Sequence, residues 1–277
     1  MAMPEGLAFP TELEREVFET AALMYPRSIP TLLRVAKRVL IWIEPFLYRV
    51  IRLNDDNPHV YTALLRAIKA KPPNFFHDAV RHFAFVSGSD SAADAKKILA
   101  LCTGIVSFGC YNTLLDPAVP ALFVGTRLQR LSLDLQSLFP PGWVDLGHSM
   151  FGYVTHLDMF DESGVNELLP DIPLLPALTH LSLVSDTPWE SALGVLEDCP
   201  RLELLFMQWF DTEPYKSSQT PQMYDIRFVW GLCEDSKGYW DDWERGARGG
   251  VDFWARGDDF VRRKRKGEIE ATRYWLD

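Results

Sequence analysis

Two similar phrases of the sequence, VTHLDM and LTHLSL, each place a histidine before a leucine and a polar side chain after it. If both phrases form neighbouring strands, His156 and His180 lie side by side and Asp158 lies one step along the sheet. A histidine beside a carboxylate can act as a general base, and two histidines with an aspartate can hold a metal ion. Arg130 and Arg227 stand at the same place in related phrases and could hold an anion. The catalytic residues of an enzyme built in this way would be His156, His180 and Asp158.

The surrounding sequence favours recognition over catalysis. Ser132 and Ser182 lie near the histidines in this arrangement, but neither stands in a GxSxG nucleophile motif. No HxxxH pattern and no cysteine pair supports a metal site, and the stretch FVSGSDS lacks the spacing of a nucleotide-binding loop. We therefore expect no cofactor and no metal, and a polar surface that recognises a partner protein. The alternative is a small-molecule-binding protein or an acid–base enzyme that uses the same histidine, aspartate and arginine side chains.

The elements that must position these side chains form a series of repeats. The pattern apolar-x-x-apolar-x-apolar occurs five times, and two looser copies, TGIVSF and DIRFVW, carry a threonine or an aspartate in the first place. The central apolar residues of these seven copies are 23, 25, 26, 24, 24 and 23 residues apart. An earlier phrase, YRVIRL, fits the start of the same series. The central residues of the seven copies are Phe83, Val106, Leu131, Leu157, Leu181, Leu205 and Phe228.

A period in the low to mid twenties with LxxLxL at its centre resembles the leucine-rich repeat. The resemblance implies an α/β solenoid of about eight parallel strands, in which each unit adds one strand. Between the strands, SAADAKKILALC, DESGVNELLP and TPWESALGVLEDCP each offer a polar capping residue followed by apolar residues at three- and four-residue spacing. These segments are predicted helices on the convex side of the solenoid.

The repeat also maps the surface on which a partner would bind. Alternate residues of a strand face opposite sides, so the residues that flank the buried central positions line the concave face of the sheet. We expect the binding surface to comprise Arg130, Ser132, Asp134, His156, Asp158, Phe160, His180, Ser182, Phe206 and Arg227.

The N-terminal part of the chain carries a second resemblance. Its landmarks are Phe9-Pro10, Glu12-Leu13, Val17-Phe18, Val35, Lys37-Arg38 and Trp42. In this order, residues 7–50 resemble the F-box, a three-helix module that binds the Skp adaptor of a cullin ubiquitin ligase while leucine-rich repeats select the client protein. The whole layout resembles the F-box-like leucine-rich-repeat proteins of mushroom-forming fungi. The resemblance implies a Skp-type adaptor as one partner and an unidentified client on the concave face; the alternative is that these helices only cap the solenoid.

The C-terminal part is rich in tryptophan and in charge. Two acidic and aromatic segments surround Gly249-Gly250, and their apolar residues have helical spacing, which predicts two amphipathic helices packed as a lid. The basic run 262–266 is interpreted as the solvated end of a helix, with a nuclear localisation signal or an anion-binding patch as the alternative. The predicted organisation is an F-box-like region over 1–53, the repeats over 54–233 and a helical C-terminal cap over 234–277.

Composition limits the partners and the compartment. The 277 residues carry a formal net charge of -10, so nonspecific attraction to nucleic acid or to an anionic membrane is not expected. The four cysteines form no CxxC pair, and the sequence contains no apolar run of signal-peptide or membrane-spanning length. These features predict a protein of the cytoplasm or the nucleus with reduced thiols.

Overall fold

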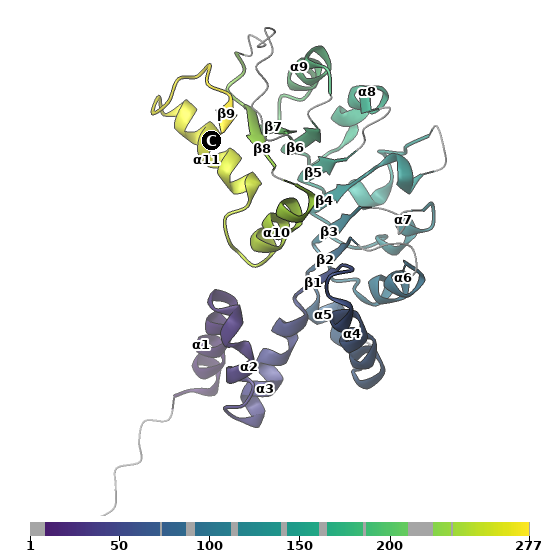
Figure 1. The fold of residues 1–277 in the computed structure, drawn as a ribbon, viewed down its shortest axis with the longest axis vertical. Helices are drawn as coiled ribbons and strands as arrows, with labels where there is room; N and C mark the ends of the chain where they lie inside the picture. The colour runs from purple at the N-terminus through teal and green to yellow at the C-terminus, as the bar shows by residue number, and fades with distance from the viewer. Residues whose placement is uncertain are drawn as a thin grey trace, which may run out of the picture.

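A computed structural model describes residues 9–72, 74–86, 92–111, 116–139, 143–160, 165–184, 187–209, 224–233 and 235–276. The strands of this part form one sheet in which every pair is parallel and the order follows the chain, from β1 to β9 (Figure 1). The strands are β1 (Val50–Leu53), β2 (His82–Phe85), β3 (Ser107–Cys110), β4 (Arg130–Leu133), β5 (His156–Met159), β6 (His180–Val184), β7 (Leu204–Trp209), β8 (Phe228–Leu232) and β9 (Trp275–Leu276). The α/β class and the parallel sheet are confirmed, with nine strands where about eight are expected.

Within the described residues, helices and short 3₁₀ turns lie between successive strands from β1 to β7, as parallel pairing requires. The N-terminal helical elements are α1 (Thr11–Met24), η1 (Pro26–Ser28), α2 (Ile29–Leu32), α3 (Lys37–Ile43) and η2 (Glu44–Tyr48). The connections include α4 (Pro58–Ala70), α5 (Asn74–Ala79), α6 (Ala92–Leu101), α7 (Val119–Leu122), η4 (Gln136–Leu138), η5 (Ser149–Phe151), α8 (Val165–Leu168), η6 (Leu169–Leu174) and α9 (Trp189–Asp198). After β8 the chain forms α10 (Ser236–Ala247) and α11 (Phe253–Arg265) before it returns to the sheet as β9.

The strand register confirms the repeat at every copy except one. Leu131 pairs with Leu157, Leu157 pairs with Leu181, and Leu181 pairs with Leu205. In β3, however, Phe108 pairs with Phe83 and with Leu131, so the central residue predicted at Val106 is wrong by two positions. The physical reason is that TGIVSF and the following residues offer two overlapping apolar patterns, and only the packing of Phe108 selects between them.

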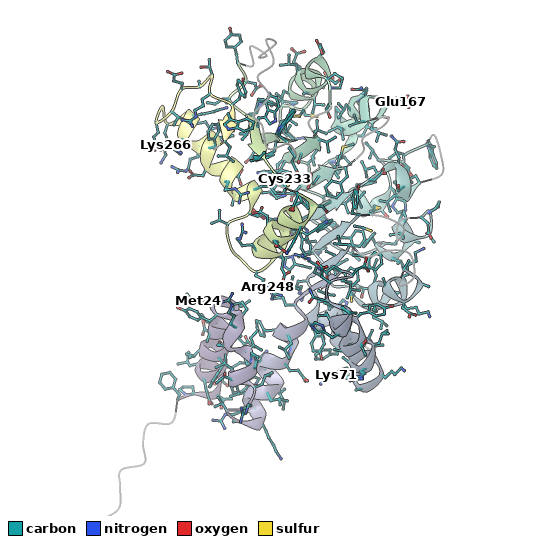
Figure 2. The ribbon with its side chains drawn as sticks, viewed as in Figure 1. Met24, Lys71, Glu167, Cys233, Arg248 and Lys266 are labelled. Atoms are coloured by element: carbon teal, nitrogen blue, oxygen red, sulfur yellow. The ribbon has the colours of Figure 1, made fainter. Side chains whose placement is uncertain are left out.

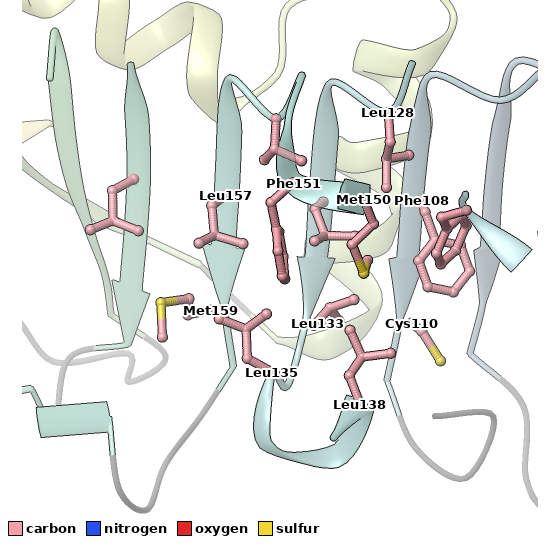
Figure 3. Close-up of a cluster of buried hydrophobic side chains, with 14 of the residues drawn as sticks. Phe108, Cys110, Leu128, Leu133, Leu135, Leu138, Met150, Phe151, Leu157 and Met159 are labelled. Atoms are coloured by element: carbon pink, nitrogen blue, oxygen red, sulfur yellow. The ribbon is translucent and has the colours of Figure 1, made fainter. Parts of the chain in front are cut away.

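The central residues fill the main core on one face of the sheet. Phe83, Phe108, Leu131, Leu157 and Leu181 are buried there with apolar residues of the connecting segments. Figure 3 shows Phe108, Leu157, Met150 and Phe151 in this cluster, with Leu135 and Leu138 where the chain leaves β4. α6, α8 and α9 lie on this side in Figure 1, so the predicted inter-strand helices are confirmed.

The opposite face of the sheet is covered by α10 and α11, which we call the C-terminal helix pair (Figure 1). Each helix begins at an aspartate whose side chain caps it: Asp235 accepts from the amide of Gly238 at 2.6 Å, and Asp252 accepts from the amide of Ala255 at 2.9 Å. Gly249 adopts a positive φ of 83° in the turn between the helices, which a residue with a side chain rarely does. The two predicted helices are confirmed, and their apolar sides pack on alternate residues of the strands such as Leu204, Phe206 and Val229.

The N-terminal helices form a small cluster of their own beside the first strand. Ala22, Ile29, Val39 and Ile43 are its buried residues. η2 contacts both α5 and β1, and the chain enters the sheet directly after it.

Within the described residues, no helix combines the length and the apolar character needed to cross a bilayer. Cys102, Cys110, Cys199 and Cys233 are all free thiols.

Candidate functional site

The two histidines singled out in the sequence do stand on neighbouring strands. His156 and His180 are paired in the register, and their rings stack with centroids 4.1 Å apart at an angle of 10°. The residue before each histidine is a threonine whose hydroxyl lies within hydrogen-bond distance of Nδ1, at 2.9 Å for Thr155 and 2.7 Å for Thr179. The repeated THL phrase therefore fixes the orientation of both imidazole rings.

The C-terminal helix pair completes the surroundings of the histidines. Asp258 of α11 lies 2.9 Å from Nε2 of His180, and the indole of Trp254 meets both imidazoles edge-on, at centroid distances of 5.2 and 5.8 Å. The pKa of His156 is lowered to about 2, because burial disfavours the imidazolium and because His180 and Arg130 add positive charge nearby. His156 is therefore neutral at physiological pH and serves as a packing surface.

Asp158 lies at the centre of a buried polar network. Only 1% of its surface is exposed, and its carboxylate accepts hydrogen bonds from the hydroxyl of Tyr239 and from Nε2 of Gln208, the latter at 2.8 Å. The same Gln208 nitrogen donates to Oγ of Ser182 at 2.7 Å. Burial raises the pKa of Asp158 to about 6, and the three hydrogen-bond partners Tyr239, Ser182 and Gln208 limit that rise.

Four further predicted residues also contact the helix pair. Arg130 donates to Asp252 at 2.8 Å, which ties β4 to the start of α11. Phe160 meets the ring of Tyr239 edge-on at 5.2 Å, and Phe206 meets Phe253 at the same distance. Ser132 is buried on the same face, and its hydrogen bond with the Tyr239 hydroxyl opposes the rise that burial causes in the pKa of Tyr239.

Two predicted residues lie elsewhere. Arg227 does not join this face: its guanidinium pairs with Asp225 at 2.6 Å and donates to the main-chain carbonyls of Leu196 and Cys199 at the end of α9. The alternation argument fails for Arg227 because the residue precedes β8 and is not part of it. Asp134 accepts from the backbone amides of Gln136 and Ser137, so its carboxylate is held at the turn where η4 begins.

The sequence interpretation missed the residues that cover the face. Tyr239, Asp252 and Asp258 are not among the residues that the repeat pattern selects. Two sets of residues in the sequence could have pointed to this contact: the polar residues on the strands, and the acidic and aromatic residues at helical spacing near the C-terminus. Only the tertiary structure shows which residue of one set contacts which residue of the other.

The arrangement fastens the helix pair to the sheet. The oxygens of Asp158 are occupied by donors from Tyr239 and Gln208, and the ring of Trp254 packs nearly perpendicular to the stacked histidines. Among the described residues, no group of three or more histidine, cysteine, aspartate or glutamate side chains is placed to hold a metal ion.

Two cavities border the helix pair. One of about 350 Å³ is lined by Gln208, Tyr239 and Arg256, and the other, of about 740 Å³, is lined by Arg130 and by the turn after α10.

In comparisons with known proteins, no family model matches this chain and no curated sequence matches it.

Proposed function

We propose that this protein is a recognition subunit whose N-terminal helices dock on a Skp-type adaptor of a cullin ubiquitin ligase, while the rest of the chain selects a client protein. The observation that carries the proposal is the concentration of exposed apolar side chains on these helices. Of twenty exposed large apolar residues in the described part of the chain, ten lie between residues 9 and 47. They are Phe9, Leu13, Val17, Leu23, Met24, Tyr25, Val35, Leu40, Ile41 and Leu47.

The hydrophobic core of the N-terminal helices is too small to bury most of their apolar side chains. Four residues form the buried cluster that joins α1, α2 and α3, and other apolar side chains pack around it only in part. Single exposed apolar residues are ordinary on a protein surface, but a contiguous group of them marks an interaction surface. A module that served only to cover the edge of the sheet would turn these side chains toward the sheet.

Exposed side chains at the start of α1 and on α3 lie around one hollow. Phe9 and Val17 border a hollow of about 390 Å³ together with Glu14 and Arg38. Arg38 donates twice to Glu14, at 2.7 and 2.9 Å, and so joins α3 to α1. Ile41, which is 69% exposed, stands three residues after Arg38 on the same side of α3. This surface, made by Phe9, Val17, Arg38 and Ile41, is termed the docking surface.

Charge supports a protein partner for the N-terminal helices. The acidic and basic side chains of residues 9–48 balance, although the whole chain carries a net charge of -10. The acidic residues are Glu12, Glu14, Glu16, Glu19 and Glu44, and the basic residues are Arg15, Arg27, Arg34, Lys37 and Arg38. A neutral apolar surface gives little attraction to nucleic acid, which is bound mainly through its phosphates.

The test is a binding titration of the full chain against a purified fungal Skp adaptor. The test variant carries Val17→Glu and Ile41→Glu. Both substitutions replace exposed residues, so they place two charges on the docking surface and leave every buried residue unchanged. The matched control carries Val124→Glu and Leu174→Glu, which have exposed fractions of 61% and 63% but lie in the connections between strands. We expect the wild type and the control to bind alike and the test variant to lose about tenfold or more in affinity, because burying an unpaired charge costs more than 1.4 kcal/mol.

Failure of the full chain to bind the adaptor would overturn the proposal. Equal loss of binding in both variants would also contradict it, because the effect would then not be specific to the docking surface.

A further inference from the structure

A cavity of about 740 Å³ lies where the N-terminal helices, the first strands and the turn after α10 meet. Met24 and Ile29 line it from the N-terminal helices, His82 and Arg130 line it from β2 and β4, and Arg248 lines it from the turn. Figure 2 labels Met24 and Arg248 on facing sides of this region. The volume lies within the range of pockets that hold small organic ligands.

The charge of this cavity is opposite to that of the protein. The chain contains 38 acidic and 28 basic residues, yet the cavity is lined by Arg49, Arg130, Arg248 and His82 and by no described aspartate or glutamate. Arg130 and Arg248 each have one carboxylate partner outside the cavity, Asp252 at 2.8 Å and Glu244 at 2.8 Å. Arg49 forms no ion pair with any of the described residues, and the charged group that acts on it most strongly is another arginine, Arg81.

The pKa of His82 is consistent with the same excess of positive charge. Its Nδ1 is buried and has no hydrogen-bond partner within the described part of the chain. The pKa of His82 is lowered to about 3, first because burial disfavours its charged form and then because Arg49, Arg130, Arg248 and Arg81 all lie near enough to repel a further positive charge. Three of these arginines, Arg49, Arg130 and Arg248, line the cavity together with the neutral imidazole of His82.

The rest of the wall is apolar. Met24, Ile29 and Phe46 face the cavity from the N-terminal helices, and Met24 is 65% exposed. A ligand that fits both parts has an anionic group for the arginines and an apolar body for these side chains. Guanidinium groups favour carboxylate and phosphate oxygens, to which they can donate two parallel hydrogen bonds.

We propose that this cavity binds a small organic anion, a carboxylate or phosphate carried on an apolar body, with the anionic group held by Arg49, Arg130 and Arg248 and the apolar body packed against Met24 and Ile29. This site is separate from the docking surface, and the proposal does not depend on the adaptor. Because the two walls belong to segments far apart in the sequence, the ligand would also join the N-terminal helices to the C-terminal helix pair.

The test is calorimetric titration of the full chain in low-salt buffer with phenyl phosphate and with benzoate, which distinguish the two anionic groups. Inorganic phosphate and phenol are the controls that lack one half of the ligand. We expect saturable binding of at least one aromatic anion, about tenfold tighter than either control, because the charged hydrogen bonds and the apolar contact contribute together. Arg49→Gln should weaken this binding about tenfold, and Arg66→Gln, at an exposed arginine of α4 that lines none of the cavities described above, should leave it unchanged.

A second readout is independent of affinity. Imidazole resonances in NMR spectra should show the pKa of His82 moving upward when the aromatic anion saturates the site, since bound negative charge offsets the nearby arginines. If Arg49→Gln does not fold, Arg248→Gln takes its place, because the Arg248 side chain is 39% exposed. Absence of saturable binding by both aromatic anions, or binding that neither arginine variant weakens, would overturn the proposal.

Discussion

Replacing Asp158 by asparagine tests the buried network that fastens the C-terminal helix pair. The pKa of Asp158 is about 6 in the folded protein against an ordinary value of 3.8, because the carboxyl is buried. The folded state therefore binds a proton that the unfolded state has already released between about pH 4 and pH 6. Stability from this group is fully present below the unfolded pKa and is lost as the pH rises through the folded pKa. Two pKa units correspond to roughly 3 kcal/mol in the free energy of unfolding.

Asp158→Asn removes this titration and keeps the shape of the side chain. The asparagine oxygen can still accept from Tyr239, and its amide can donate to Gln208 after the Gln208 amide turns over. We expect the stability of the wild type relative to the variant to fall by roughly 3 kcal/mol between about pH 4 and about pH 7.

Denaturant unfolding followed by tryptophan fluorescence measures the difference at each pH. Other titrating groups are common to both proteins and cancel in the comparison. Asp56→Asn, at an exposed turn, provides a matched control for the chemical change itself. Parallel stability curves for the wild type and Asp158→Asn would refute the reasoning, because they would mean that Asp158 titrates alike in both states. A relative stability that rises with pH would refute it more strongly.

Two further perturbations concern the same sheet face. The pKa of His156 is about 2 in the folded state against 6.5 in the unfolded state, so the stability that this group contributes is full above the unfolded pKa and is lost as the pH falls. On acidification to about pH 4, the free energy of unfolding of His156→Gln should therefore fall by roughly 1 to 3 kcal/mol less than that of the wild type. Denaturant unfolding measures this difference. Gly109→Ala would place a Cβ 2.6 Å from the indole of Trp240 and should lower the free energy of unfolding by roughly 1–3 kcal/mol. At Gly194 nothing lies within 4 Å of an added Cβ, so Gly194→Ala should raise the free energy of unfolding by up to about 1 kcal/mol through helix propensity. Equal effects of the two alanines in thermal unfolding would contradict the packing of α10 on β3.

The periodic features of this fold could be predicted from the sequence because they depend on neighbours within one repeat. Alternation along each strand placed Leu157 in the core and His156 and Asp158 on the other face, and the common period placed His156 beside His180. The helices on either side of Gly249 were predictable for the same reason, since their caps and apolar spacing are local.

What covers the polar face was decided only by the tertiary structure. Asp258 meets His180 from 78 positions along the chain, and Asp252 meets Arg130 from 122, and no local pattern specifies such partners. Lys264 is a further example: it stands in a basic run that was expected to be solvated, yet it is 3% exposed and donates to the carbonyl of Phe228 at 2.7 Å. Periodicity fixes which way a side chain points, whereas the packing of distant segments decides whether it meets water, an ion pair or another part of the chain.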